Sequence, residues 1–439
     1  MQKESVMSNT IPEGKLARTG VAGVAALKMG VRSIKHRSKR PFMSEERQQQ
    51  EKASVDEKNA QTLFKALTQL RGTALKVAQM VGMDQGFLPE SYHKELEQSF
   101  HKVPPLNRVL INKVISNELN DSPKNLFFEF NNKAFAAASL GQVHKAKPPA
   151  DHQRFGSDIA VKIQYPGIDK AIKSDMAMIR GVARGMHNTH HILQSIDEIE
   201  ARLNEEIDYQ IEANNTRWFK EKTHMEGITI PNVYQELSSQ RVLTTEFIHG
   251  LHLDDWLATN PSQTLRNLAA QRLYDFFIVS SKSLQCLHAD PNIGNYLFHE
   301  DGSITVIDFG CVRHLSDTFT NVFPQLIKAY LYDKPDDLIP AYKKIGMTFE
   351  NFDKQLYQEV LRPFGQWVTL PFKNDSFDFA KHSDYTQRGK EPMKQLHELA
   401  NVDRIAEEFI FHNRTIYGLC QIFERMGAKV KIRHHWGLD

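Results

Sequence analysis

Cysteine is scarce in this chain, and long apolar runs are missing from it. Three cysteines occur among 439 residues, Cys286, Cys311 and Cys420, and they are widely spaced. They form neither a C-x-x-C pair for zinc or redox chemistry nor an even set for a disulfide framework, which fits a reducing cytosol. No apolar run reaches the roughly 18 to 20 residues that cross a bilayer, and residues 1–15 lack the apolar core of a secretory signal. We expect a cytoplasmic protein that is either soluble or peripheral on the inner face of a membrane.

An excess of charge of one sign is also lacking. The formal net charge is +2, and acidic and basic residues are interspersed, so no bulk field favours nucleic acid as a partner. Residues 14–40 combine small apolar residues with a basic end, and such a segment could lie on an anionic membrane surface. The alternative is a helix packed on the main domain or a frayed basic tail, because three glycines weaken an isolated helix there.

The order of the expected elements predicts an α+β fold. A polar linker before residue 59 precedes helical periodicity, which continues to about residue 119. Strand-like runs follow within 127–147 and at 159–165, and a strongly periodic helix is expected over 196–220. Two more strand candidates lie at 233–237 and 241–248. Beyond Gly250 the chain is mainly helical, with short strands at 296–298 and 304–309. We therefore divide the chain into four parts, residues 1–58, 59–122, 123–250 and 251–439.

A lysine in the third strand candidate is the first residue that suggests chemistry. Alternation along a strand points Lys162 away from Val161 and Ile163 and into the space between a β-rich and a helical lobe. A lysine in that position can bind the α- and β-phosphate oxygens of a nucleotide. The alternative is an ordinary edge-strand lysine that limits aggregation.

The helix expected over 196–220 carries several carboxylates. Glu212 is the natural partner to hold Lys162 upright. On one ideal helix Asp208 lies about 40° from Glu212, whereas Glu206 lies about 160° from Asp208. These carboxylates therefore cannot all serve one lysine, and a solvated acidic face is the alternative, favoured for Glu205.

Two acidic loops follow in the second half of the chain. The segment HADPNIGN places Asp290 five residues before Asn295, which is the spacing of base and metal-binding asparagine in the kinase loop H-R-D-x-x-x-x-N. A D-F-G triplet begins at Asp308, after an expected strand. Asp308 and Asn295 are the expected ligands of Mg²⁺, and Asp290 the expected base. A lone D-F-G says little, and the order of all these elements is what predicts a nucleotide site.

Two further segments complete the expected ATP site. Residues 244–250 fit a hinge, in which backbone groups of Glu246 and Ile248 pair with the adenine edge. Alanines at 136–138 stand where kinases have glycines of a flexible G-x-G-x-x-G flap, although Gly141 is present. Because alanine has no easy access to positive φ, we expect a stiffer loop that clasps the phosphates differently. The residues of this loop that are expected to contact ATP are Ala136, Ala137, Ala138, Ser139 and Gln142.

Two kinase features are absent from the second half. Ala289 stands where the kinase loop has its arginine, so control by activation-loop phosphorylation is not expected. No A-P-E follows the D-F-G, and Ser316 is a candidate helix N-cap shortly after it. A peptide-docking platform is therefore not expected.

Together these motifs resemble the UbiB/AarF/Coq-type atypical kinase-like family, which is associated with ubiquinone biosynthesis. The matching segments are LKVAQM (75–80), FAAASLGQVH (135–144), AVK (160–162), EIDYQIEA (206–213), HADPNIGN (288–295) and DFG (308–310). The resemblance implies a bilobal protein-kinase-like fold with a small β-rich N-lobe, a mostly helical C-lobe and a helical N-terminal extension packed over the cleft. It also implies an ATPase more than a protein kinase.

The resemblance carries over to four more residues. Lys76 and Gln79 match the lysine and glutamine of the family's K-x-G-Q helix, while Glu206 and Asp208 match its E-x-D pair. A contact between Lys76 and either carboxylate would tie the extension to the nucleotide lobe. Ala78 replaces the motif glycine, and the extra methyl group would loosen that packing.

Three functions are consistent with the sequence. The first is hydrolysis or transfer of the γ-phosphate of Mg-ATP in support of isoprenoid quinone biosynthesis, with ATP or ADP and Mg²⁺ as ligands. The resemblance then implies quinone-precursor lipids or quinone-biosynthesis proteins as partners. The second is a kinase for a small-molecule, lipid or protein hydroxyl, and the third is a nucleotide-sensing scaffold without catalysis.

Two features outside the motifs have a simpler interpretation. Three histidines near residue 190 lack a suitably spaced carboxylate, so they are expected at the surface and not in a metal site. An apolar helix face near the end of the chain is expected in the core of the helical lobe, or else against a partner helix. Its members are Ile405, Phe409, Ile416, Leu419 and Phe423.

Overall fold

The computed structural model describes residues 106–138, 140–149, 158–183, 189–349, 352–399, 402–404 and 406–438, together with isolated positions nearer the N-terminus. Residues 14–40 and the helices expected over 59–105 lie largely or wholly outside the described residues. The chain divides into two compact units. The first comprises Met1–Ala146, Val161–Asp208 and Gln240–Val242, and the second Lys147–Ala160, Tyr209–Ser239 and Leu243–Asp439.

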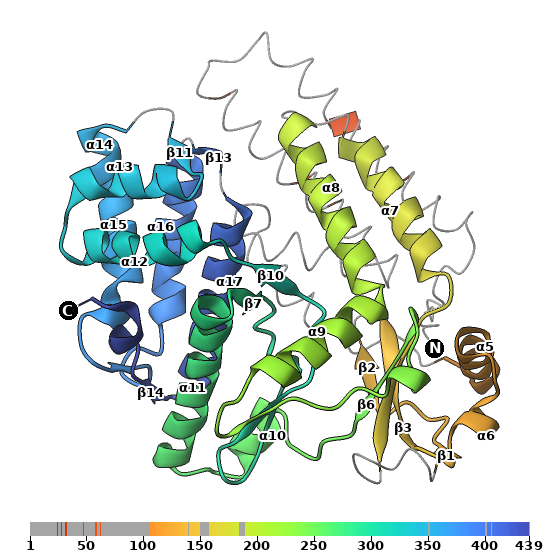
Figure 1. The fold of residues 1–439 in the computed structure, drawn as a ribbon. Helices are drawn as coiled ribbons and strands as arrows, with labels where there is room; N and C mark the ends of the chain where they lie inside the picture. The colour runs from red at the N-terminus through yellow and green to blue at the C-terminus, as the bar shows by residue number, and fades with distance from the viewer. Residues whose placement is uncertain are drawn as a thin grey trace, which may run out of the picture. The chain divides into compact units, whose positions relative to one another are not determined.

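The first unit combines a small antiparallel sheet with helices (Figure 1). The strand order is β1-β3-β4-β6, with β2 paired to β3 through a tight hairpin in which Ala138 opposes Gly141. In β4, Val161 and Ile163 are fully buried while Lys162 between them is half-buried, as the predicted alternation requires. The elements are α5 (Arg108–Leu119), α6 (Pro123–Leu126), β1 (Glu129–Phe130), β2 (Ala136–Ala138), β3 (Gly141–Lys147), β4 (Ile159–Gln164), α7 (Ile168–Ala183), α8 (Thr189–Glu206) and the start of β6 (Val242–Glu246).

Helices α7 and α8 pack side by side in this unit (Figure 1). Arg180 of α7 reaches across to α8, where its Nη2 lies 2.6 Å from the Asp197 carboxylate and also contacts Glu200. The hydrogen bonds to Asp197 and Glu200 raise the pKa of Arg180 above its ordinary value. Ion pairs near the surface contribute about 0 to 1 kcal/mol each to stability. Their main effect here is to fix the register of the two helices.

The prediction of a single helix over 196–220 is wrong, because the structure has two helices there. Helix α8 ends at Glu206, and α9 (Tyr209–Lys222) begins after a break at Ile207 and Asp208. The buried Gln164 side chain donates from Nε2 to the Ile207 carbonyl at 2.6 Å, which satisfies an acceptor that a continuous helix would give to the next turn. Ile211 is 39% exposed, so the apolar periodicity predicted for 196–220 does not form one continuous buried face.

The second unit is mainly helical and holds the rest of the chain. Strands β8 and β9 pair antiparallel with β5 parallel to β9, and β7 pairs antiparallel with β10. Two further short pairs are β11 with β13 and β12 with β14. The bounds are α9 as above, β5 (Ile228–Thr229), most of β6, α10 (Leu253–Ala258), α11 (Gln263–Ile278), β7 (Cys286–His288), β8 (Tyr296–Phe298), β9 (Ile304–Val306), β10 (Val312–His314), α12 (Asp317–Leu331), α13 (Pro335–Lys344), β11 (Thr348–Phe349), α14 (Lys354–Leu356), α15 (Arg362–Val368), β12 (Phe377–Asp378), α16 (Tyr385–Leu399), β13 (Val402–Arg404), α17 (Glu407–Met426) and β14 (Lys429–Val430).

Two local expectations in this unit have different outcomes. Ser316 is the N-cap of α12, and its hydroxyl accepts from the Phe319 N–H at 3.1 Å, as predicted. The prediction of a strand at 233–237 is wrong, because Gln235–Leu237 form a 3-10 helix. Thr244 donates its hydroxyl to the Leu237 carbonyl at 2.6 Å, so a side chain takes the place of a ladder partner.

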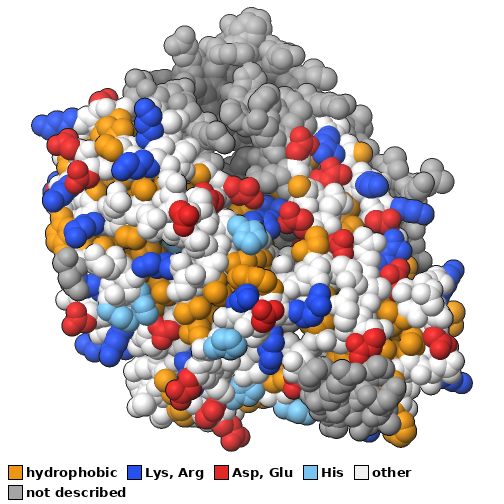
Figure 2. Space-filling view, in the orientation of Figure 1, with side chains coloured by type: hydrophobic (Ala, Val, Ile, Leu, Met, Phe, Trp, Pro, Cys, Tyr) orange, Lys and Arg blue, Asp and Glu red, His pale blue; other side chains and the backbone are white. Residues whose placement is uncertain are grey.

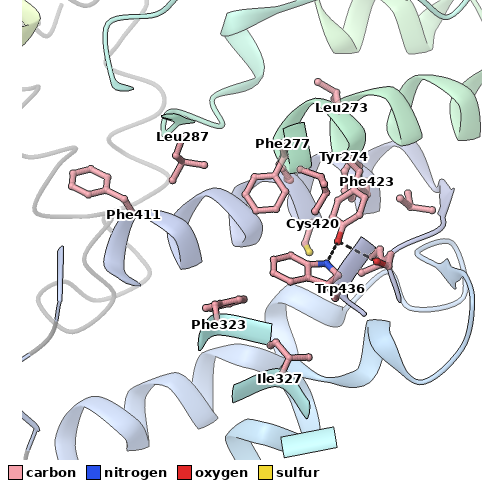
Figure 3. Close-up of a cluster of buried hydrophobic side chains, with 14 of the residues drawn as sticks. Leu273, Tyr274, Phe277, Leu287, Phe323, Ile327, Phe411, Cys420, Phe423 and Trp436 are labelled. Atoms are coloured by element: carbon pink, nitrogen blue, oxygen red, sulfur yellow. Dashed lines mark hydrogen bonds between the residues drawn. The ribbon is translucent and has the colours of Figure 1, made fainter. Parts of the chain in front are cut away.

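The core of the second unit lies between α11, α12 and α17. Tyr274 and Phe277 of α11, Phe323 and Ile327 of α12, and Cys420 and Phe423 of α17 meet there (Figure 3). Trp436 closes the cluster, and its indole nitrogen donates to the Tyr274 hydroxyl at 2.6 Å. The predicted apolar face of the last helix is therefore largely core: Phe409, Leu419 and Phe423 are buried and Ile416 is half-buried, while Ile405 lies outside the described residues.

The surface mixes both signs of charge, as the composition suggests. Acidic and basic side chains are interspersed over the face seen in Figure 2. Among the residues that the structure describes, no helix is both long and apolar enough to cross a membrane.

Close packing of α15 on α16 gives a stability prediction. A Cβ on Gly389 would lie 2.0 Å from Cζ2 of Trp367, whose ring stacks on Tyr385 at 5.3 Å. Gly389→Ala should therefore lower the free energy of unfolding by about 1–3 kcal/mol, since the indole must move. Gly181→Ala in α7 is the control, because nothing lies within 4 Å of its added Cβ. Urea denaturation measures both, and an equal effect of the two changes would contradict the packing argument.

A buried histidine gives a pH-dependence prediction. His412 is 2% exposed among Phe277, Phe319 and Phe323, and burial lowers its pKa to about 3. In the unfolded chain the pKa of His412 is near 6.5, so below that pH the unfolded chain binds a proton that the folded chain does not. The free energy of unfolding therefore falls as the pH falls toward 3. Between pH 7 and pH 5 the loss should be about 2 kcal/mol. His412→Phe should remove this share of the pH dependence in urea titrations, whereas the exposed His224→Gln should leave it. A wild-type slope in the His412 variant would contradict the assignment.

Candidate functional site

One face of α9 holds the D-F-G segment within the second unit. Glu212, Asn215 and Phe219 follow one another at helical spacing on this face. Asn215 donates from Nδ2 to the Phe309 carbonyl at 3.0 Å, and the Phe219 ring packs on Phe309 with 4.8 Å between centroids. Phe309 is fully buried, so α9 fixes the residue that follows Asp308.

Two carboxylates border the glycine of this segment. A Cβ on Gly310 would lie 3.2 Å from Asp308 Oδ1 and 3.8 Å from Glu212 Oε2. The Gly310 N–H donates to Asp308 Oδ1 at 2.9 Å, and Glu212 is only 4% exposed. Both carboxylates therefore lie beside the glycine of the D-F-G segment.

The loop with Asp290 is joined to the D-F-G segment at its base. His288 ends β7, is 3% exposed, and its Nε2 lies 2.7 Å from the Asp308 carbonyl oxygen. Because a carbonyl oxygen only accepts, Nε2 carries the proton in this bond. Ala289 adds a backbone bond to the Cys311 carbonyl at 2.9 Å. The two acidic loops are therefore held as one piece.

Asp290 and Asn295 contact each other directly. Asn295 donates from Nδ2 to Asp290 Oδ2 at 2.9 Å and to the Asp290 carbonyl at 3.2 Å. The amide nitrogen is thereby used, and the amide oxygen is the atom of Asn295 that suits Mg²⁺. A hard cation of this type needs few protein oxygens when phosphates supply the others. Among the described residues, no three or more His, Cys, Asp or Glu side chains form a cluster suited to a metal.

The predicted hinge, residues 244–250, lies wholly in the second unit. The Glu246 N–H donates to the Asn232 carbonyl at 2.8 Å, and the neighbouring Phe247 N–H donates to the Asp158 carbonyl at 3.1 Å. Of the two backbone groups of Glu246, only the carbonyl is then suited to an adenine edge. Ile248 follows outside any helix or strand and is half-buried.

The other residues predicted for the nucleotide lie in the first unit. Lys162 is in β4, and Ala136, Ala137 and Ala138 form β2, while Ser139 is outside the described residues. Gln142 is 1% exposed, with its Oε1 accepting from the Leu106 N–H at 2.8 Å and its Nε2 2.6 Å from His144. These two bonds hold the Gln142 side chain in place within its own unit. The nucleotide roles of these residues stay predictions.

The residues assigned to the lid are described only in part. Glu206 ends α8, and Asp208 in the break accepts from Gln240 Nε2 at 3.4 Å. Lys76 and Gln79 lie outside the described residues, as does Ala78, so the lid contact stays a prediction. His187 also lies outside them, and the side chains of the neighbouring histidines in α8 are not described.

The comparison with known sequences agrees with these motifs. Residues 98–359, well over half of the chain, match the ABC1 atypical kinase-like domain. The chain belongs to this family. The resemblance to UbiB/AarF/Coq-type proteins is thereby confirmed, and so is the α+β kinase-like fold.

Named relatives in the ABC1 family are distant. The probable serine/threonine-protein kinase abkA of Dictyostelium discoideum is 27% identical over 68% of this chain and 55% of that protein. The mitochondrial atypical kinase COQ8B of Danio rerio is 27% identical over 74% of this chain and 53% of that protein. The chain spans about half the length of these curated relatives. Because COQ8B is named as mitochondrial, the cytoplasmic location expected from the sequence stays a prediction.

A solved structure resembles the chain over most of its length. The Mycobacterium tuberculosis protein Rv3197, determined in complex with erythromycin, has a TM-score of 0.61 and 25% sequence identity. The match covers 87% of this chain and 96% of that chain, so the ABC1 fold extends beyond the 98–359 core.

Three contributing residues were missed by the sequence reasoning. Asn215 and Phe219 stand at i+3 and i+7 from Glu212, so extending that helix face would have found them. Arg414 of α17 has its Nη2 4.0 Å from Asp290 Oδ1. Nothing in local spacing connects these two residues, because they lie in distant parts of the chain.

The hydrogen bond from His288 to the Asp308 carbonyl gives a prediction about the D-F-G segment. His288→Phe keeps an aromatic ring beside Phe309, at 5.2 Å in the wild type, but removes the donor to the Asp308 carbonyl. Leaving that acceptor without its partner should cost about 1–3 kcal/mol of unfolding free energy. It should also loosen the D-F-G backbone, seen as faster amide hydrogen exchange at Phe309 and Gly310. The exposed His224→Phe serves as control, and unchanged exchange in the His288 variant would contradict the proposed link.

Proposed function

We propose that this chain is an Mg-ATP-dependent phosphoryl-transfer enzyme that hydrolyses ATP or passes its γ-phosphate to an acceptor hydroxyl. The observation that carries this proposal lies within the second unit. There, the carboxylates of Asp308 and Glu212 border Gly310, and Asn295 is hydrogen-bonded to Asp290. A buried histidine joins the two loops. Acid and amide oxygens at these positions are the groups that phosphoryl transfer uses.

Each side chain has a distinct task in this proposal. Asp308 and Asn295 would hold Mg²⁺ through a carboxylate and an amide oxygen, and the bound ion would offset the charge of the phosphate oxygens. Asp290 would accept a hydrogen bond from the attacking water or hydroxyl and orient it toward the γ-phosphate. Lys162 and Glu212, from different units, keep the roles expected from the sequence, on the α- and β-phosphates and as the partner of that lysine.

The segment after the D-F-G supports a small acceptor or water over a peptide. Gly310 is followed by β10, which pairs with β7, and the Ser316 cap then starts α12 at once. Protein kinases dock peptides on a long segment in this region. Because so little chain separates Gly310 from α12, ATP hydrolysis or transfer to a compact hydroxyl compound fits better than phosphorylation of a protein.

The link to quinone biosynthesis rests on the family. The atypical kinase COQ8B is among the relatives, and we propose by analogy that ATP turnover here supports isoprenoid quinone biosynthesis. Quinone-precursor lipids or quinone-biosynthesis proteins are then the proposed partners, and residues 14–40 the proposed contact with an anionic membrane.

Labelled ATP separates hydrolysis from transfer. Release of free phosphate, increased by anionic vesicles that contain a polyprenylated phenol, would support an ATPase acting at a membrane. Label on the phenol or on a protein would support a kinase. Binding of Mg-ATP without turnover under all of these conditions would favour the nucleotide-sensing scaffold and contradict the proposal.

The metal assignment predicts separate losses for two aspartates. Asp308→Asn should abolish Mg²⁺-dependent nucleotide binding in calorimetry, because it removes a charged ligand. Asp290→Asn should keep that affinity and lower kcat by about 10²–10⁴-fold. Asp301→Asn is the matched control, since Asp301 is exposed in a turn where it accepts from Ser303. Unchanged Mg-ADP affinity in Asp308→Asn would remove the metal assignment.

A further inference from the structure

Helix α17 makes an unusually close contact with the loop that carries Asp290. A Cβ on Gly418 would lie 2.4 Å from Cγ and 2.8 Å from Cβ of Pro291, so only glycine allows this approach of helix and loop. Arg414 stands one turn earlier on the same face of α17. The packing at Gly418 therefore determines where the Arg414 side chain meets the loop.

Arg414 faces the carboxylate of Asp290 from the side opposite Asn295. Its Nη2 lies 4.0 Å from Oδ1, while Oδ2 accepts from Asn295 Nδ2 at 2.9 Å. The two side chains are 27% and 25% exposed, so the pair is partly shielded from water. At 4.0 Å, one water can complete the contact, or a small rotation can close it. The carboxylate is thus held between an amide and a guanidinium.

The first turns of α17 hold the neighbouring strand as well. Glu407 lies 3.5 Å from Arg313 Nε in β10, and the Arg313 guanidinium stacks over Phe411 at 4.6 Å. Glu408 accepts from the Ser316 N–H at 2.5 Å. Helix α17 therefore contacts both the segment after Gly310 and the loop with Asp290, which restricts how far Arg414 can move from the carboxylate (Figure 1).

The loop itself carries no cation beside Asp290. Ala289 occupies the preceding position and is fully buried, and the rest of the loop from Pro291 to Asn295 is uncharged. Under the proposed function, Asp290 would lie near the negative charge of a triphosphate. A nearby guanidinium offsets that repulsion, and its planar fork restricts the rotation of the carboxylate.

We propose that Arg414 is a positioning residue for Asp290, supplied to the loop by the C-terminal helix. This inference rests on the proposed function. Arg414 acts through the carboxylate: it keeps Oδ1 turned toward the acceptor and lowers the cost of placing an anion beside the nucleotide. The competing account is an ion pair that only stabilises the contact between α17 and the loop.

A double-mutant cycle separates the two accounts. Arg414→Met should lower kcat for ATP turnover by about 10- to 100-fold, with the KM for ATP and the affinity for Mg-ADP within about twofold of wild type. Arg414→Lys should restore part of kcat, since it keeps the charge and loses the fork. In an Asp290→Asn background, Arg414→Met should have no further effect, because the group through which it acts is gone.

Arg425→Met is the matched control on the same helix. Arg425 is half exposed and pairs with Asp254 at 2.5 Å, so its loss removes an ion pair of α17 away from the loop. Its kcat should equal that of wild type. Thermal unfolding of all variants shows whether a lower rate only reflects a lower folded fraction.

Several results would overturn the inference. A kcat of Arg414→Met equal to that of wild type would do so. So would a loss of kcat from Arg414→Met that is as large in the Asp290→Asn background as in the wild type. A rate that falls only in proportion to the folded fraction would favour the structural ion pair. If the wild-type chain binds Mg-ATP and shows no turnover, the proposed function fails and this role fails with it. Turnover by the wild type with a fully active Arg414→Met variant refutes the positioning role alone.

Discussion

The hydrogen bond between His288 Nε2 and the Asp308 carbonyl is the constraint on which the candidate site depends. It is 2.7 Å long, and the His288 ring that donates it packs beside the rings of Phe276 and Phe309. It joins the strand that leads to Asp290 with the segment that carries Asp308, alongside the backbone bond from Ala289 to the Cys311 carbonyl. Buried bonds of this kind are costly to leave unmade, so the relative position of the two aspartates is set by the core and not by a ligand.

Helices from two distant parts of the chain complete this arrangement. Helix α9 holds the Phe309 carbonyl through Asn215, and α17 packs on Pro291 through Gly418. Each contributes one polar group at a fixed distance and one tight apolar contact. Close packing fixes the distance between the elements, and the hydrogen bond from Asn215 fixes their register.

The sequence predicted what local spacing determines. The loop with Asp290 and Asn295, the D-F-G segment, the alternation around Lys162 and the Ser316 cap all follow from neighbours within one strand or turn. The break at Ile207 was not predictable, because its carbonyl is satisfied by Gln164, 43 residues earlier. Asn215 was reachable from Glu212 by helical spacing, whereas Arg414 was not, since only the packing of α17 on Pro291 brings it to Asp290.

The short connection after Gly310 has a consequence for regulation. In a kinase with a long activation segment, the D-F-G can move because the chain beyond it is loosely held. Here β10 is paired with β7, Ser316 caps α12, and Glu408 accepts from the Ser316 backbone. Three independent interactions thus hold the few residues that such a switch would need to displace. Control of this site is therefore expected to act through access to the nucleotide or through the first unit, and not through rearrangement of the D-F-G segment.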